Sequence, residues 1–176
     1  FIADTNPDLT EDEVIQIYDN VRLVGAESDF ATLHKVYGWM VNGVQFTTQD
    51  GLPRMIPLID FDNWDKNIFR VVNQFIVEYT NNGQKENRRP DVLLFVNGMP
   101  LCVIELKNPA DANATIYDAW EQINIRYWRD IPHLLHYCPL ACISDGVKTR
   151  LGTVRTPYEH FYAWRRVNEG DAVSTL

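Results

Sequence analysis

The sequence predicts an α/β fold with a mixed β-sheet flanked by helices. Short apolar, β-branched segments cluster in the middle of the chain, one helical segment follows them, and a further apolar strand comes after it. A strand, a crossover helix and a returning strand form a parallel pair, whereas strands joined by short turns are antiparallel. The sheet is therefore expected to contain both directions.

The first third of the chain predicts a helix and then an ambiguous region. Residues 8–24 are expected to be helical, because Thr10 and Glu13 have the spacing of a capping box. Residues 25–50 favour no single element, although 36–46 are compatible with an extended segment.

The central region predicts strands separated by polar connections. A strand is expected over 55–60, followed by a loop over 62–65. Residues 69–79 are β-branched and aromatic, which favours one further strand, and the polar residues 80–89 predict a loop.

A hairpin and a helix follow. Asn97-Gly98 is a strong short-range hairpin signal, and it joins predicted strands over 91–96 and 101–107. A capping box then opens a helix over 115–129. The remaining segments predict strands over 140–144 and 151–154 and a short helix over 158–166.

Three charged residues lie on or beside the hairpin strands. Asp91 begins the first strand, and Glu105 and Lys107 lie two residues apart near the end of the second. Side chains at that spacing share one face of a strand, and an unpaired charge on a half-buried strand is costly. Two carboxylates beside one ammonium indicate a site for a divalent metal and a polarised water. The alternative is a turn-capping surface Asp and a solvated Glu–Lys pair.

The register of the hairpin decides whether the two carboxylates meet. A two-residue loop pairs Asp91 with Ile104, which places Asp91 and Glu105 on opposite faces. One extra loop residue, or a bulge at Met99-Pro100, pairs Asp91 with Glu105 directly. Because proline cannot donate a ladder hydrogen bond, we predict an irregular hairpin that brings both carboxylates to one side.

The expected site suits Mg²⁺ chemistry. This ion prefers oxygen ligands and retains several waters, and Asp91, Glu105 and the Leu106 carbonyl could supply three oxygens. Bound Mg²⁺ would stabilise charge on a phosphate and lower the pKa of a bound water. Lys107 would position that water or offset charge developing on the phosphate.

Pro90-Asp91 followed by Glu105-x-Lys107 resembles the PD-(D/E)xK nuclease signature. The wider chain is similar to the N-terminal endonuclease region of the R (restriction and motor) subunit of type I restriction–modification enzymes. The resemblance implies one endonuclease domain over 1–176, with a helical or irregular part over 1–50 and a restriction-endonuclease-like core over 51–166. The segments that carry it, in the family's order, are 58–61, 71–75, 88–109, 143–146, Gly152-Thr153 and 161–164.

The resemblance also implies a function. It implies Mg²⁺-dependent hydrolysis of phosphodiester bonds in double-stranded DNA, in a complex with methylation and specificity subunits. In this family an ATP-driven motor follows the nuclease. No Gly-x-x-x-x-Gly-Lys-Ser/Thr motif is present here, so ATP is expected to bind outside this chain, in a longer protein of which it is a fragment. The alternative is a catalytically silent module on the same fold that docks DNA or protein.

One helix position departs from the family pattern, which is Gln-x-x-x-Tyr. Gln122 matches, which implies that it positions the water or a phosphate, but Tyr127 comes one residue late. At about 100° per residue, Gln122 and Arg126 lie about 40° apart, whereas Gln122 and Tyr127 lie about 140° apart. Tyr127 is expected to continue an apolar stripe. Arg126 is expected to occupy the tyrosine's face, where it either contacts a DNA phosphate or is simply solvated.

Composition limits the function classes further. A net charge of −8 argues against tight DNA binding by this domain alone, because DNA affinity comes largely from Lys and Arg. Local basic residues are nevertheless expected to contact DNA, namely Arg88, Arg89 and Arg126. Three cysteines without a visible secretory signal indicate reduced thiols in the cytoplasm. No apolar run reaches the length of a membrane span.

Overall fold

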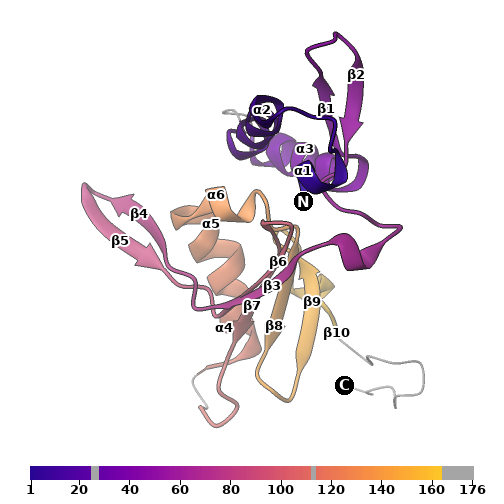
Figure 1. Ribbon diagram of the computed structural model, residues 1–176. Coiled ribbons are helices and arrows are strands. Elements are labelled where there is room, and N and C mark those ends of the chain that lie inside the picture. The colour runs from indigo at the N-terminus through magenta and orange to yellow at the C-terminus, as the bar shows by residue number, and fades with distance from the viewer. Residues whose placement is uncertain (25–27, 112–113, 164–176) are drawn as a thin grey trace, which may run out of the picture. The chain divides into compact units, whose positions relative to one another are not determined.

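The computed structural model describes residues 1–24, 28–111 and 114–163. The chain forms two compact units, one over residues 1–70 with 96–99, and the other over 71–95 with the part described from 100 onward. The first contains the amino-terminal helices and a small sheet, and the second contains most of the main sheet (Figure 1).

The first unit joins short and long helices to a two-stranded antiparallel sheet. Ile17, Phe46 and Ile56 form a buried cluster, with Ile2 and Leu9 packed against it. The elements are α1 (Ile2–Thr5), α2 (Glu11–Arg22), α3 (Asp29–Asn42), β1 (Val44–Thr47), β2 (Pro53–Ile56) and the 3-10 helix η1 (Trp64–Lys66).

The capping box predicted for α2 is confirmed. The Thr10 hydroxyl accepts the Glu13 N–H, and the Glu13 carboxylate accepts the Thr10 N–H at 2.8 Å. Glu13 also accepts the Gln49 N–H at 2.9 Å, which ties the β1–β2 connection to the helix. β2 ends at Ile56, so the strand predicted over 55–60 is confirmed only at its first two residues.

The extended segment considered within 36–46 is wrong over most of its length, because α3 runs to Asn42. One face of this helix packs inward. Gly43 ends it at a φ of 85°, where a Cβ would lie 2.6 Å from the Ile56 carbonyl oxygen. The buried positions recur every four residues, at Thr32, Val36 and Met40.

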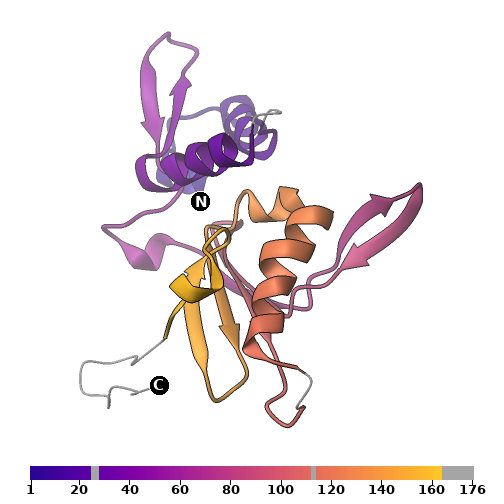
Figure 2. The ribbon, with the colours of Figure 1, turned by 180° about the vertical axis from the view of Figure 1, so that it is seen from behind.

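The second unit is built on a six-stranded sheet in the order β10-β9-β8-β7-β6-β3. β7 and β8 are parallel, whereas β8 pairs antiparallel with β9 and β9 with β10, so the predicted mixed sheet is confirmed. The helix between β7 and β8 runs along this sheet, as both views show (Figures 1 and 2). The strands are β3 (Phe69–Asn73), β6 (Val92–Val96), β7 (Met99–Leu106), β8 (Leu140–Ser144), β9 (Thr149–Thr153) and β10 (Tyr162–Ala163).

Two predictions for the central region are wrong. Residues 69–79 form two strands, β3 and β4 (Val77–Asn81), because the chain turns at Gln74, whose φ is 51°. Residues 80–89 are not a loop, because β5 (Gln84–Arg88) pairs with β4 through the turn Asn82-Gly83. Asn-Gly adopts the positive φ angles that a two-residue hairpin requires, and this turn outweighs the polar composition.

The β6–β7 hairpin has a two-residue loop. β6 ends at Val96 and β7 begins at Met99, and Asn97 and Gly98 between them have φ angles of 50° and 86°. The predicted extra loop residue is therefore wrong, whereas the bulge at Met99-Pro100 stays a prediction. Asp91 lies one residue before β6, outside the strand, so the alternation of strand faces does not fix the direction of its side chain.

The helix predicted over 115–129 is confirmed, with a change of pitch inside it. Thr115 and Asp118 form the predicted capping box. The helix consists of α4 (Ile116–Glu121), the π-helical segment η2 (Gln122–Tyr127) and α5 (Trp128–Asp130), and α6 (Pro132–Leu135) follows.

The carboxy-terminal prediction is partly wrong. The helix expected over 158–166 is a three-residue 3-10 turn, η3 (Tyr158–His160), and the chain then enters β10. Residues 164–166 lie outside the described part of the chain. Within the described part, no helix combines the length and apolar character needed to span a membrane.

Candidate active site

Two strands and one helix of the second unit bring the predicted site residues together. Asp91 precedes β6, Glu105 lies in β7, Lys107 follows β7, and Gln122 begins the π-helical segment. The carboxyl end of β7 therefore faces the helix that crosses over to β8.

Asp91 and Glu105 are in direct contact through the main chain of Asp91, and the predicted meeting of their two carboxylates stays a prediction. The Asp91 N–H donates to Glu105 Oε1 at 3.3 Å, and the Leu106 N–H donates to Asp91 Oδ2 at 2.8 Å. Asp91 lies outside its strand, and its main-chain N–H makes this contact with the Glu105 carboxyl group. Leu106 thus holds Asp91 through its amide, while the predicted role of its carbonyl stays a prediction.

Glu105 is the most buried member of the site, with an exposed fraction of 0%. Tyr127 donates its hydroxyl proton to Glu105 Oε1 at 2.6 Å, and the Gln122 side-chain amide donates to Glu105 Oε2 at 2.7 Å. Both carboxyl oxygens are therefore oriented by groups on the crossover helix. This arrangement satisfies a polar group that would otherwise be costly to bury.

Gln122 links two ionisable groups at the end of β7, the Glu105 carboxyl and the Lys107 ammonium. Its amide nitrogen contacts Glu105, and its amide oxygen accepts from Lys107 Nζ at 2.8 Å. Since one side chain orients both groups, Gln122 fixes the distance between the carboxyl and the ammonium.

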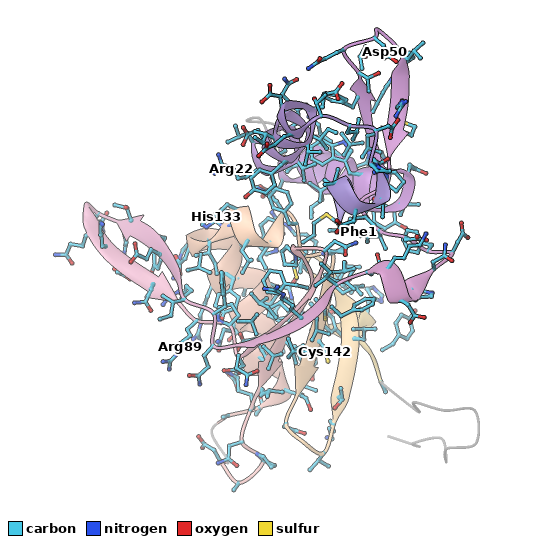
Figure 3. All side chains as sticks on the ribbon, viewed as in Figure 1. Phe1, Arg22, Asp50, Arg89, His133 and Cys142 are labelled. Atoms are coloured by element: carbon cyan, nitrogen blue, oxygen red, sulfur yellow. The ribbon has the colours of Figure 1, made fainter. Side chains whose placement is uncertain are left out.

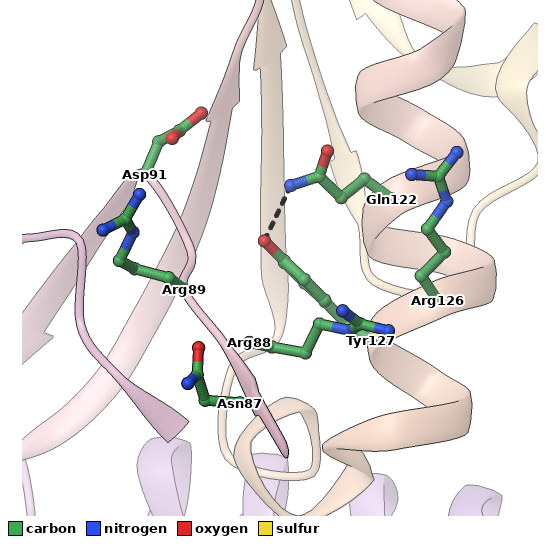
Figure 4. Close-up of a pocket in the computed structure, with 7 residues that line it drawn as sticks. All are labelled: Asn87, Arg88, Arg89, Asp91, Gln122, Arg126 and Tyr127. Carbon is green, nitrogen blue, oxygen red and sulfur yellow. Dashed lines mark hydrogen bonds between the residues drawn. The ribbon is translucent and has the colours of Figure 1, made fainter. Parts of the chain in front are cut away.

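The expectation that Tyr127 faces away from Gln122 is wrong. The Gln122 amide nitrogen lies 2.9 Å from the Tyr127 hydroxyl oxygen, as the dashed line in Figure 4 marks. An angle of about 140° applies only at α-helical pitch, whereas residues 122–127 are π-helical, with hydrogen bonds of the i→i+5 type. Tyr127 is also buried, so its ring belongs to the predicted apolar stripe while its hydroxyl contacts the site.

Burial controls the protonation of this cluster. Loss of solvent, with a smaller contribution from the nearby Asp91 charge, raises the pKa of Glu105 to about 8, against the opposing effect of the Tyr127 hydrogen bond. Burial also raises the pKa of the Tyr127 hydroxyl above its usual value, and so does the Glu105 charge. At neutral pH the tyrosine therefore remains a hydrogen-bond donor.

The arginines named from the sequence line one pocket beside the site. It is formed by seven residues (Figure 4), and Arg89 and Arg126 are both exposed. Figure 3 shows Arg89 at the foot of the β4–β5 hairpin. The lining residues are Asn87, Arg88, Arg89, Asp91, Gln122, Arg126 and Tyr127.

Arg88 is held differently from the other two arginines. Its guanidinium bonds the Asp130 carboxylate at 2.7 and 2.6 Å and lies over the Tyr79 ring, 5.2 Å from the ring centroid. Arg129 also binds Asp130 at 2.7 Å. Arg88 therefore joins the β4–β5 hairpin to α5, and its predicted role in DNA binding stays a prediction.

Replacing Asp130 by alanine is expected to destabilise the protein by about 1–3 kcal/mol, because Arg88 loses a charge-assisted partner whose side chain is only 6% exposed. Urea unfolding would measure the loss. Arg129→Ala is the matched control, and its effect should stay within about 1 kcal/mol, since that side chain is 65% exposed. Equal small losses in both variants would contradict the structural role of Arg88.

A second pocket is also lined by Asp91 and lies near the end of β7. Asn73 and Gln74 line it, although the sequence motifs did not single them out as site residues. The Gln74 N–H donates to the Asp91 carbonyl at 2.9 Å, so the positive-φ turn after β3 supports the segment that carries Asp91. The full lining is Asn73, Gln74, Asp91, Val92, Leu106, Lys107 and Asn108.

The donor set fits a hard divalent cation. Two carboxyl groups lie in the same site, Glu105 is fully buried, and the charge of Lys107 lowers the pKa of Glu105. A bound divalent cation would replace the proton that the raised pKa keeps on Glu105 at neutral pH, and oxygen donors suit Mg²⁺. Among the described residues, no group of three His, Cys, Asp or Glu side chains could hold a metal unaided, so main-chain oxygens and waters would complete the shell.

The mixed sheet, the crossover helix and the clustered Asp, Glu and Lys define a restriction-endonuclease-like nuclease fold. A sequence model described as "Type I restriction enzyme R protein N terminus" matches residues 3–160. The chain therefore belongs to the family of N-terminal regions of type I restriction enzyme R proteins, which confirms the resemblance inferred from the sequence.

Curated relatives carry matching names. A putative type I restriction enzyme MjaIXP endonuclease subunit of Methanocaldococcus jannaschii is 35% identical over 180 residues, covering 99% of this chain and 17% of the relative. The type I restriction enzyme HindI endonuclease subunit of Haemophilus influenzae is 35% identical over 178 residues, covering 97% and 16%. This chain therefore spans about one sixth of the length of these relatives.

Proposed function

We propose that this chain is the Mg²⁺-dependent DNA endonuclease domain of a type I restriction enzyme R subunit, hydrolysing phosphodiester bonds in double-stranded DNA. The observation that carries the proposal is one continuous hydrogen-bonded cluster. It runs from Asp91 through Glu105 and Gln122 to Lys107.

The proposed roles follow from charge and position. Asp91 and Glu105 would hold Mg²⁺ together with the Leu106 carbonyl. The bound ion would stabilise negative charge on the phosphate and lower the pKa of a bound water. Lys107 would face the charge that develops on the phosphate, and Gln122 would hold Lys107 in place while orienting the water.

Arg89 and Arg126 would bind DNA phosphates next to the one that is cut, since both are exposed at the pocket that also contains Asp91 and Gln122. Two local cations are few for duplex DNA, and the net charge of the chain is −8. Other parts of a longer subunit, with an ATP-driven motor, and the methylation and specificity subunits would supply the remaining affinity.

Titration calorimetry with Mn²⁺ or Mg²⁺ would test the metal site directly. The wild-type protein is expected to bind the metal, and Asp91→Ala to bind it at least about 100-fold more weakly. Substitution of residues that only hydrogen-bond to a metal ligand already lowers metal affinity by about 10–100-fold, and loss of a ligand should lower it at least as much. Asp62→Ala, which removes an exposed carboxylate outside the site, is the matched control.

The rival function is a silent DNA- or protein-docking module, which the acidic net charge favours. Equal metal affinities of wild type and Asp91→Ala would support this rival. So would the absence of binding in both proteins when a short DNA duplex is present to supply a phosphate ligand.

A further inference from the structure

The crossover helix changes pitch at the point where it meets the site. Residues 122–127 are π-helical, whereas α-helix precedes and follows them. Short π-helical segments are rare within α-helices and occur frequently at functional sites. Here the segment begins at Gln122 and ends at Tyr127, the two helix residues that bond Glu105.

The π-helical pitch is what makes the three-way contact possible. In an α-helix, residues five apart point about 140° away from each other, so Gln122 and Tyr127 could not meet over one carboxylate. In this helix the two side chains bond each other at 2.9 Å, and each bonds a different oxygen of Glu105. A segment with one residue fewer would bring the same two side chains together at α-helical pitch.

Packing of the two flanking α-helical segments prevents them from rotating relative to each other, so the π-helical segment between them cannot convert to α-helix. On the amino-terminal side, Ile116 and Ala119 are buried. On the carboxy-terminal side, Trp128 is buried and donates its indole N–H to the Val154 carbonyl at 2.6 Å. Both ends are fixed by packing, whereas Ile125 in the middle is 49% exposed.

We infer that Tyr127 is a positioning residue for Glu105 and Gln122, that the π-helical segment brings it to them, and that one exposed residue of this segment is surplus to the site. The role of Tyr127 is indirect. Its hydroxyl holds one Glu105 oxygen while Gln122 holds the other, so the carboxylate presents one fixed orientation toward Asp91.

Deletion of Ile125 tests the inference, with insertion of one alanine after Ile125 as the matched control. The deletion should convert the segment to α-helix and keep both flanks in place. The insertion separates Gln122 and Tyr127 by six positions, which neither pitch accommodates. A double-mutant cycle with Gln122→Ala and Tyr127→Phe, read as urea midpoints, would report whether the two residues still interact.

The expected result is a cooperative unfolding transition and a non-additive Gln122–Tyr127 midpoint shift in both the wild type and the deletion variant. The insertion variant should give additive shifts. The inference is overturned if the deletion variant fails to fold, or if it folds with the interaction lost. This readout needs no metal, so it tests the part of the inference that concerns the helix pitch even if the proposed metal site proves wrong.

Metal affinity distinguishes a positioning role of Tyr127 from a purely structural role. This second experiment rests on the proposed function. Tyr127→Phe is expected to weaken Mn²⁺ binding roughly tenfold or more, by the same factor in the wild-type and deletion backgrounds. If the wild type binds Mn²⁺ and Tyr127→Phe leaves that affinity unchanged, Tyr127 only packs the core and the positioning role is overturned.

Discussion

Lys107→Ala is expected to lower DNA cleavage by an R subunit carrying this domain by about 10³-fold, while metal binding changes little. The substitution removes the ammonium proposed to face the developing phosphate charge, and single electrostatic groups of this kind are worth about 10²–10³-fold. It also releases the Gln122 amide, which Lys107 bonds at 2.8 Å. Single-turnover cleavage of supercoiled DNA would measure the loss.

Lys85→Ala is the matched control for this experiment. Lys85 is an exposed lysine on β5 that does not line either pocket beside Asp91. Cleavage should be close to wild type in this variant. Undiminished cleavage by Lys107→Ala would refute the proposed role of the lysine, because its charge and its hold on Gln122 would both be dispensable.

Glu105→Gln is expected to stabilise the metal-free protein at pH 8–9 and to change its stability little near pH 5. Burial raises the pKa of Glu105 from 4.5 to about 8, so the folded state binds a proton that the unfolded state releases. The resulting contribution of Glu105 to the free energy of unfolding is fully present below pH 4.5 and is lost as the pH rises through about 8. Glutamine at this position cannot ionise, so the variant keeps the roughly 3–5 kcal/mol of unfolding free energy that the wild type loses at high pH.

Urea unfolding in a chelator, measured from pH 5 to pH 9, would test this prediction. Glu86→Gln is a suitable control, because Glu86 also accepts a tyrosine hydroxyl, from Tyr79 at 2.5 Å. That hydrogen bond lowers the pKa of Glu86, so its replacement should give no gain at high pH. Parallel pH profiles for the wild type and Glu105→Gln would show that Glu105 is ionised in the metal-free fold.

The sequence was sufficient for the sheet class and for naming residues that the structure places close together. The Asp91, Glu105 and Lys107 spacing depends on strand ends, which local patterns report well, and β8 over 140–144 matches its predicted bounds. Both capping boxes were also readable, because each is a contact between residues three apart. Such features need no knowledge of distant neighbours.

The wrong predictions concern segments where the residue types favour one conformation and a neighbouring turn favours another. The polar segment 84–88 is a strand because the Asn82-Gly83 turn pairs it with 77–81. The loop at Asn97-Gly98 has two residues, and Asp91 lies outside β6, where hydrogen bonds from the Leu106 N–H and to Glu105 hold it. In both cases a turn conformation outweighed the expectation drawn from residue type.

The sequence by itself determined the family, the mixed sheet and the identity of the charged cluster, because these follow from motifs and short-range patterns. Only the tertiary structure decided the place of Tyr127. Packing fixes the helix on both sides of residues 122–127, and the resulting π-helical pitch brings the tyrosine hydroxyl to Glu105. A helical wheel assumes one pitch throughout, so no counting of residues along the chain could have revealed this contact.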